Sequence, residues 1–177
     1  REIEELERRL RENPLDPRAQ EQLAERIREQ NVRANYEYAL EHNPEAFGNV
    51  TMLWMRVVVN GVSLVAMVDT GAQASVMSVE FAEQCGIMRL VDRQFSGKVR
   101  GAGEADMIGR VHCCTLQIGK QFLPSSFSIV RGSHLDFLLG LDQLRRHSAI
   151  VDLRQNVLRI NDEAIPFLTE SEIPKKT

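Results

Sequence analysis

The sequence predicts a mainly β unit preceded by a small α-helical one. Residues 1–48 are rich in charge and almost free of glycine, and their apolar residues recur at helical spacing. After Gly48 the pattern changes to β-branched apolar runs separated by turn residues, which is typical of strands. We therefore expect a helical domain at 1–48, a β domain at 49–168 and a flexible tail at 169–177.

Two helices are expected in the first 48 residues. The first closes at Asn13-Pro14, and the second begins at Asp16, a good N-cap followed by proline, and ends before Asn43. The second helix has only a thin apolar face, made of Ala19, Leu23, Ile27, Ala34 and Tyr38. We expect it to pack on another helix or domain, because its own burial would not offset the entropy of ordering it.

The β domain begins with strands at 52–59 and 62–68, which Asn60-Gly61 joins as a hairpin. Ser78 is expected to cap a short helix that stops at Cys85-Gly86. Strands at 108–118 and 122–130 follow, then an apolar run at 135–139 and a short helix opened by Asp142. A last hairpin pairs 149–153 with 157–160.

Composition excludes several functions. Net charge is −3, with 22 basic and 25 acidic residues, so the chain has no basic field for nucleic acid. No apolar run approaches the roughly 20 residues of a membrane helix, and no signal peptide opens the chain, which starts at Arg1 and is expected to be part of something longer. The cysteines number 3, two of them adjacent, which is a poor disulfide framework and favours a reducing compartment.

Residues Asp69-Thr70-Gly71-Ala72 are the most informative in the chain. They follow the apolar run 64–68, so a buried strand presents a carboxylate in a tight glycine turn. A second apolar run ending in glycine, Leu138-Leu139-Gly140, is expected to pass beside this turn. The alternative is an ordinary turn, because Asp bonds its own backbone and Gly tolerates positive φ.

These motifs resemble the retroviral-type aspartic proteases, in which two identical chains each donate one Asp-Thr-Gly or Asp-Ser-Gly loop. The match is closest to the DNA-damage-inducible protein 1 family, through residues 87–93 (IMRLVDR), 108–112 (IGRVH) and 138–147 (LLGLDQLRRH). Residues 16–48 are similar to the helical domain that precedes the protease in that family. The resemblance implies a retropepsin-like closed β-barrel after the helical domain.

The resemblance also implies the chemistry. Asp69 would be catalytic, supported by Thr70, Gly71 and Ala72. Because only one Asp-Thr-Gly is present, the enzyme would be a homodimer whose two Asp69 carboxylates share a proton and activate one water. No metal, cofactor or covalent intermediate is needed. Family members carry ubiquitin-binding domains outside this region, which implies ubiquitinated protein substrates, a proteasome shuttle role and a cytoplasmic location, with the nucleus as a second one.

The flap of such a protease would lie at 97–103, where three glycines give backbone freedom. The expected flap and substrate-binding residues are Lys98, Val99, Arg100, Gly101, Ala102, Gly103 and Leu139. The alternative for this stretch is a plain flexible hairpin loop.

Other polar residues are expected to be structural. Asp142 follows Gly140 and could be a second acid, but it is more simply an N-cap or a partner for Arg145 or Arg146. His112-Cys113-Cys114 lacks a second ligand pair for zinc, and strand alternation points Cys113 away from its neighbours. The lone histidines, His42, His134 and His147, have no nucleophile pattern around them.

Three functions remain open from the sequence. The first is the homodimeric aspartic endopeptidase, in which the hairpin at 149–160 contributes contacts between the chains. The second is a dimerisation or binding module of a shuttle protein, with the protease fold and an idle acidic site. The third, a protease that processes a viral-type polyprotein, is disfavoured by the helical segment.

Overall fold

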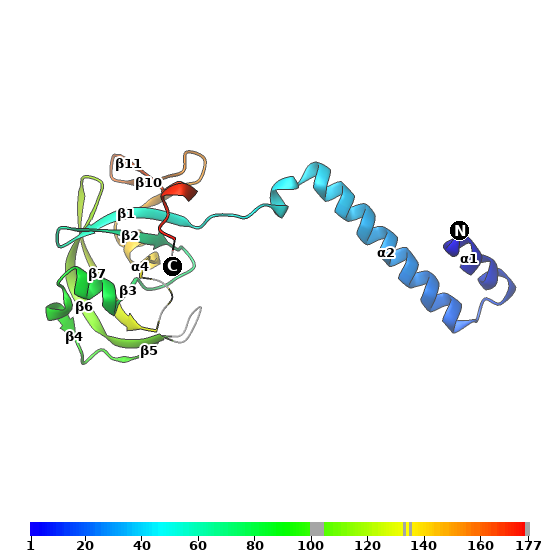
Figure 1. The fold of residues 1–177 in the computed structure, drawn as a ribbon, viewed down its shortest axis with the longest axis horizontal. Helices are drawn as coiled ribbons and strands as arrows, with labels where there is room; N and C mark the ends of the chain where they lie inside the picture. The colour runs from blue at the N-terminus through cyan, green and yellow to red at the C-terminus, as the bar shows by residue number, and fades with distance from the viewer. Residues whose placement is uncertain (100–104, 133, 135, 176–177) are drawn as a thin grey trace. The chain divides into compact units, whose positions relative to one another are not determined.

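The computed structural model describes residues 1–99, 105–132, 134 and 136–175, and the chain divides into two compact units. Arg1–Val50 form a helical unit, and Thr51–Thr177 form a unit built mainly of strands, the β unit (Figure 1). Within the described ranges, no helix combines the length and the apolar character that a membrane crossing requires.

The helical unit contains two helices, α1 (Glu2–Glu12) and α2 (Pro17–His42), and a 3-10 turn, η1 (Pro44–Phe47). The predicted start of α2 is confirmed, because Asp16 Oδ1 accepts hydrogen bonds from Arg18 N–H (3.0 Å) and Ala19 N–H (3.2 Å). These bonds satisfy two of the N–H groups that a helix start leaves without partners. The long helix ends where Asn43-Pro44 predicted.

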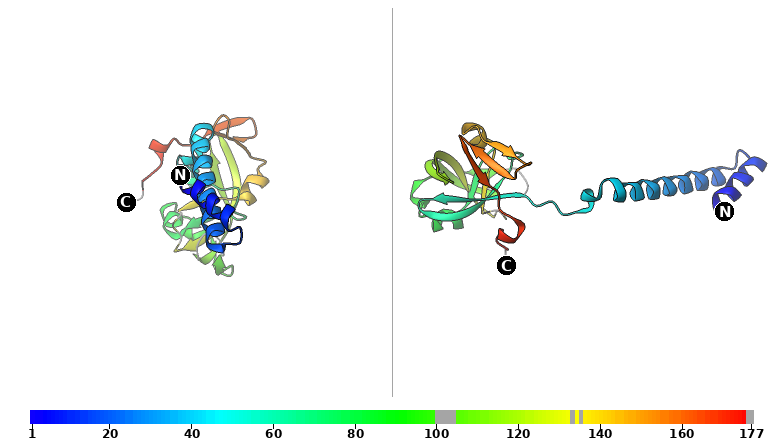
Figure 2. Two further views of the ribbon diagram at one scale, coloured as in Figure 1. Left: turned by 90° about the vertical axis from the view of Figure 1, so that its right-hand side faces the viewer. Right: turned by 90° about the horizontal axis from the view of Figure 1, so that it is seen from above.

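The core of the helical unit is small. Figure 2 shows α1 folded back along the first part of α2, and the buried side chains of the two helices are Leu6 and Ala19. Ile27 and Tyr38, expected on the packed face of α2, are 43% and 63% exposed. The thin apolar stripe therefore buries little within this unit.

The β unit opens with the predicted hairpin, β1 (Leu53–Val59) and β2 (Val62–Val68). Asn60 and Gly61 connect the strands with φ values of 50° and 77°. Positive φ at both positions gives a turn whose twist matches that of paired strands. Alternate residues of the two strands, among them Met55, Val57 and Ala66, face the core.

Six further strands complete the main sheet: β3 (Val76–Ser78), β4 (Val91–Asp92), β5 (Gly97–Val99), β6 (Ala105–Ile118), β7 (Gln121–Arg131) and β8 (Phe137–Leu139). The strand order is β1-β2-β8-β3-β7-β6-β4, with β5 paired to β6. Val58 and Val59 of β1 also pair with β6, so the sheet closes on itself around the core. The mainly β architecture after a helical segment confirms the predicted fold class.

Strand β8 brings distant parts of the chain together. It runs parallel to β2, with Val68 beside Leu139, and antiparallel to β3. The residues that follow these paired positions, Asp69 and Gly140, therefore leave the sheet at the same edge. This placement creates the site described below.

Short helices follow two of these strands: α3 (Val79–Gln84), with the 3-10 turn η2 (Met88–Leu90), and α4 (Leu141–Arg146). Ser78 caps α3 as predicted, because its Oγ accepts a hydrogen bond from Phe81 N–H at 3.1 Å. The prediction that Asp142 is an N-cap was wrong. Gly140 is the N-cap of α4, and the Asp142 side chain bonds Ser75.

The expected alternation of the cysteines on β6 was also wrong. The pairing of β6 with β7 shifts register between Val111 and Cys114, so strict alternation is lost there. His112 and Cys113 are both exposed, whereas Cys114 is half-buried. Burial raises the pKa of the Cys114 thiol. A local irregularity of this kind leaves no periodic signal in the sequence.

A second sheet has the order β11-β10-β9, made of β9 (Ile150–Asp152), β10 (Val157–Ile160) and β11 (Glu163–Pro166). The predicted hairpin is β9–β10, and β11 was not predicted. The hairpin of β10 and β11 lies at the opposite end of the β unit from β4 and β5 (Figure 1). The tail, expected to be loose, contains a 3-10 turn, η3 (Glu170–Glu172), with a capping box between Thr169 and Glu172.

Candidate active site

Asp69 lies directly after β2 and is half-buried. Its backbone N–H donates to Leu139 O at 3.0 Å, and its backbone O accepts from Ala72 N–H at 3.3 Å. The first bond attaches the residue to β8, and the second closes the Asp-Thr-Gly turn. Asp69 is therefore held through its backbone on both sides.

The Asp69 side chain is oriented by the same turn. Its Oδ1 accepts a hydrogen bond from Gly71 N–H at 2.8 Å, and a Cβ atom at Gly71 would lie 3.1 Å from Oδ1. Thr70 and Gly71 are exposed, and Ala72 is half-buried. Within the described part of the chain, Oδ2 has no hydrogen-bond partner, so this oxygen is available to a water or to a second molecule.

The Leu138-Leu139-Gly140 segment lies beside the Asp69 turn and is hydrogen-bonded to it. Leu139 is only 2% exposed and contacts the turn through its backbone oxygen. The structure thus puts Leu139 in the core and not on the surface where a substrate contact was expected. Leu141 N–H donates to Ala72 O at 2.7 Å, which extends the attachment beyond Asp69.

A pair of side chains, buried Ser75 and half-buried Asp142, joins the same two segments and was not predicted. Ser75 Oγ donates to Asp142 Oδ1 at 2.7 Å, and Ser75 N–H donates to Asp142 Oδ2 at 3.0 Å. The expectation that Asp142 is structural agrees with these bonds, although its partner is Ser75 and not Arg145 or Arg146. The two residues are 67 positions apart, so no local pattern could have revealed the pair.

The expected flap is described in part. β5 pairs with the start of β6, so Lys98 lies opposite Asp106 and Val99 opposite Ala105. These strands are the arms of a hairpin. The remaining expected flap residues, Arg100, Gly101, Ala102 and Gly103, lie outside the described residues.

No described hydrogen bond joins His112 or His147 to Asp69. His112 Nε2 bonds Asp92 Oδ2 at 2.9 Å, and this bond holds the pKa of Asp92 below its usual range. His147, the C-cap of α4, has a lowered pKa, mainly because burial disfavours its charged form. Among the residues whose positions are described, no three His, Cys, Asp or Glu side chains gather as a metal site would require.

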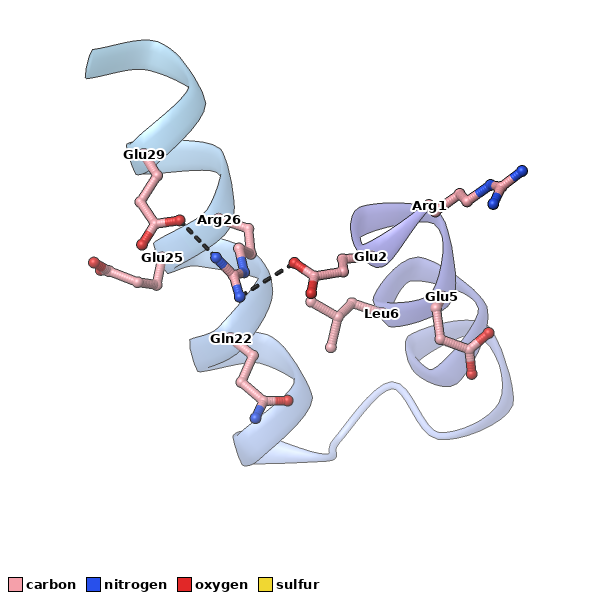
Figure 3. A pocket seen from close by; sticks show the side chains of 8 residues that line it. All are labelled: Arg1, Glu2, Glu5, Leu6, Gln22, Glu25, Arg26 and Glu29. Atoms are coloured by element: carbon pink, nitrogen blue, oxygen red, sulfur yellow. Dashed lines mark hydrogen bonds and ion pairs between the residues drawn. The ribbon is translucent and has the colours of Figure 1, made fainter. Parts of the chain in front are cut away.

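The helical unit contains a cavity of about 610 Å³ between α1 and α2 (Figure 3). Arg26 bridges its walls, with bonds to Glu2 (3.1 Å) and Glu29 (2.8 Å). A cavity of about 480 Å³ in the β unit is lined by residues such as Trp54, Phe81 and Pro174. Asp69 is not among the residues that line these two cavities.

The Asp69 turn supplies one carboxylate of the kind that acid-protease chemistry uses. Peptide hydrolysis of this class needs two facing carboxylates, one acting as base and the other as acid. The only other carboxylate close to this loop in the described hydrogen-bond network, Asp142, has both oxygens occupied by Ser75.

Comparison with known proteins agrees with this geometry. A family model described as "Aspartyl protease" matches residues 44–152. The chain therefore belongs to the aspartyl protease family, and its fold is retropepsin-like.

Individual relatives show which group of aspartyl proteases the chain belongs to. The crystal structure of the retroviral protease-like domain of Ddi1 from Leishmania major is 37% identical, with a TM-score of 0.63, over 71% of this chain and 100% of that one. DNA damage-inducible protein 1 of Neurospora crassa is 51% identical over 95% of this chain and 38% of its own length. This is a chain of the DNA damage-inducible protein 1 family.

A further relative is the UBA domain-containing protein Mud1 of Schizosaccharomyces pombe. It is 48% identical over 91% of this chain and 48% of its own length. The chain thus spans between about one third (35%) and one half (48%) of the length of the curated relatives it matches.

Proposed function

We propose that two copies of this chain form an aspartic endopeptidase in which the two Asp69 carboxylates face each other across a two-fold axis. The observation that carries the proposal is the Asp69 side chain: Gly71 N–H fixes one oxygen at 2.8 Å, and the other has no partner in the described part of the chain. Two such groups, brought together, would share one proton and bind one water between them.

In the proposed reaction, one Asp69 carboxylate removes a proton from the water as the water attacks the peptide carbonyl carbon. The protonated Asp69 of the other chain donates its proton to the carbonyl oxygen, which gives a tetrahedral diol. Collapse of the diol then returns one proton to a carboxylate and moves another to the leaving nitrogen, so the C–N bond breaks. No covalent enzyme intermediate forms.

The proposed substrate is an extended polypeptide bound between the acidic loops and the flap hairpins. Strand-like backbone hydrogen bonds would supply affinity, and apolar pockets on alternate sides would supply selectivity. Family membership and the UBA domain named in Mud1 support ubiquitinated proteins as the substrate class, in the ubiquitin–proteasome system. The cytoplasm and the nucleus are the proposed locations of this activity. Ubiquitin and the proteasome would be contacted by domains outside this chain.

The decisive test is cleavage of a polyubiquitinated protein by the purified chain and by Asp69→Asn. Loss of the carboxylate is expected to lower the single-turnover rate by about 10²- to 10⁴-fold, the usual contribution of a general acid or base. Asp162→Asn is the matched control, because Asp162 is exposed on the turn between β10 and β11. Cleavage that is unchanged in Asp69→Asn would show the proposal to be wrong.

Mixing the two chains tests whether the site is shared. Wild type and Asp69→Asn are mixed in equal amounts and left until subunits have exchanged between dimers. If each site needs two Asp69 residues, about one quarter of the dimers then carry an intact site, so the mixture keeps about one quarter of the activity of wild type at the same total chain concentration. A chain with a complete site of its own would retain one half. A wild-type dimer that cleaves nothing would instead favour the idle binding module.

A further inference from the structure

Ser75 is at the centre of a hydrogen-bond network behind the Asp69 turn. Its side chain is completely buried, with 0% exposure. The hydroxyl donates to Asp142 Oδ1 at 2.7 Å and accepts from Gly140 N–H at 2.9 Å. The backbone O of Ser75 accepts from Ser128 N–H at 3.1 Å, which connects the same residue to β7.

Asp142 is held in this network by hydrogen bonds and not by an ion pair. Its two oxygens accept from Ser75 N–H, from Ser75 Oγ and, at 2.8 Å, from Gln143 N–H. None of the described Lys, Arg or His side chains lies within ion-pair distance of it. The groups around the Asp142 side chain are all hydrogen-bond donors, so each needs an acceptor. A carboxylate accepts with both of its oxygens, whereas the amide of an asparagine at this position would accept with only one.

The network joins the end of the Asp69 loop to the segment after β8. Bonds between backbone groups run beside it, from Leu141 N–H to Ala72 O (2.7 Å) and from Asp142 N–H to Gln73 O (3.2 Å). The loop is thus attached at its start by Asp69 N–H and at its end by Ser75. Its conformation can vary little while both attachments persist.

We propose that Ser75 and Asp142 are positioning residues that hold Asp69 in the geometry needed to face its counterpart. This inference rests on the proposed function. Two carboxylates that share a proton and a water tolerate little displacement, since a misplacement of about 1 Å in a reacting group can cost about 10²-fold in rate. Bonds to a charged acceptor are stronger than neutral ones, which explains an acid at position 142.

The kinetic test compares Ser75→Ala, Asp142→Asn and the double variant with wild type. Each single variant is expected to lower kcat per folded dimer by about 10- to 100-fold, with KM within about threefold. Because both changes break one network, the double variant should be no slower than the slower single variant. Ser75→Thr, which keeps the hydroxyl, should restore kcat, and Asp162→Asn should leave it unchanged.

Two results would overturn the inference. One is a kcat per folded dimer that stays at the wild-type value, with activity falling only in step with the folded fraction. The other is a double variant whose loss equals the product of the two single losses, because independent residues combine in that way.

Amide hydrogen exchange tests the same inference without any activity. In Ser75→Ala, the amides of Asp69, Ala72 and Leu141 should exchange at least about tenfold faster, while those of β10 and β11 keep their rates. Unchanged exchange in the loop would refute the positioning role even if the wild-type enzyme is active. Faster exchange in a chain that cleaves nothing would support the positioning role and count against the proposed activity.

Discussion

At the scale of single residues, Gly140 illustrates how close packing and not backbone freedom can require a glycine. Its φ of −96° suits any residue, but a Cβ atom would lie 2.8 Å from the carbonyl oxygens of both Ala72 and Ala74. Both obstacles are backbone atoms of the Asp69 loop. The glycine that ends the Leu-Leu-Gly run therefore lets that loop approach β8.

Gly140→Ala is expected to lower the free energy of unfolding by about 1–3 kcal/mol, because the loop must move to admit the methyl group. Urea unfolding of the purified chain measures the change. Gly97→Ala is the control, since a Cβ at Gly97 meets no atom within 4 Å. Equal urea midpoints for the two variants would contradict the packing explanation.

At the scale of elements, the β9–β10 hairpin is closed by Asp152. Its Oδ1 accepts from Gln155 N–H and Arg154 N–H, both at 3.1 Å, and its Oδ2 accepts from Arg159 Nε at 3.2 Å. The Gln155 N–H and the Arg159 guanidinium hold the pKa of Asp152 below its usual range. The turn is therefore stabilised by the charged form of the side chain.

This pKa shift predicts a pH-dependent stability. Because the pKa is lower in the folded state than the unfolded value of about 3.9, the stabilisation is complete above that value. It disappears as the pH falls through the folded pKa. The difference in unfolding free energy between wild type and Asp152→Asn, measured by urea unfolding, should be constant from pH 7 to pH 5 and should shrink progressively as the pH falls below about 3.9. A difference that does not change over this range would contradict the prediction.

At the scale of the whole molecule, activity is expected to depend on a second chain. β9 is an edge strand of its sheet, and Ile150 and Leu153 are 59% and 70% exposed. Exposed apolar side chains on an open strand edge are suited to pairing with another chain. The hairpin that we expected to contribute contacts between chains thus has a surface fit for that role.

Ile150→Arg is expected to weaken dimerisation at least about tenfold, because it puts a charge into an apolar contact. Sedimentation velocity over a micromolar concentration series measures the association. Phe122→Arg is the control, since Phe122 is also exposed (67%) but lies on β7. Wild-type association in Ile150→Arg would exclude the hairpin from the interface.

The sequence by itself determined the features that depend on near neighbours. The Asp16 and Ser78 caps, the Asn60-Gly61 hairpin and the Asp-Thr-Gly turn all lie where the local pattern predicted, because their hydrogen bonds join residues at most a few positions apart. Asp69 could be singled out as a candidate catalytic acid for the same reason, because the strand, the acid and the glycine lie within a few residues of one another.

The expected passage of Leu138-Leu139-Gly140 beside the Asp69 loop is confirmed, but only the tertiary structure decided the other contacts that hold the loop. The insertion of β8 between β2 and β3, the pairing of β1 with β6, the register shift before Cys114 and the Ser75–Asp142 pair all join or offset segments far apart in the chain. Such contacts depend on how the whole sheet closes. A buried serine bonded to an aspartate 67 residues away has the same local sequence as a solvated one, and only the packed fold distinguishes them.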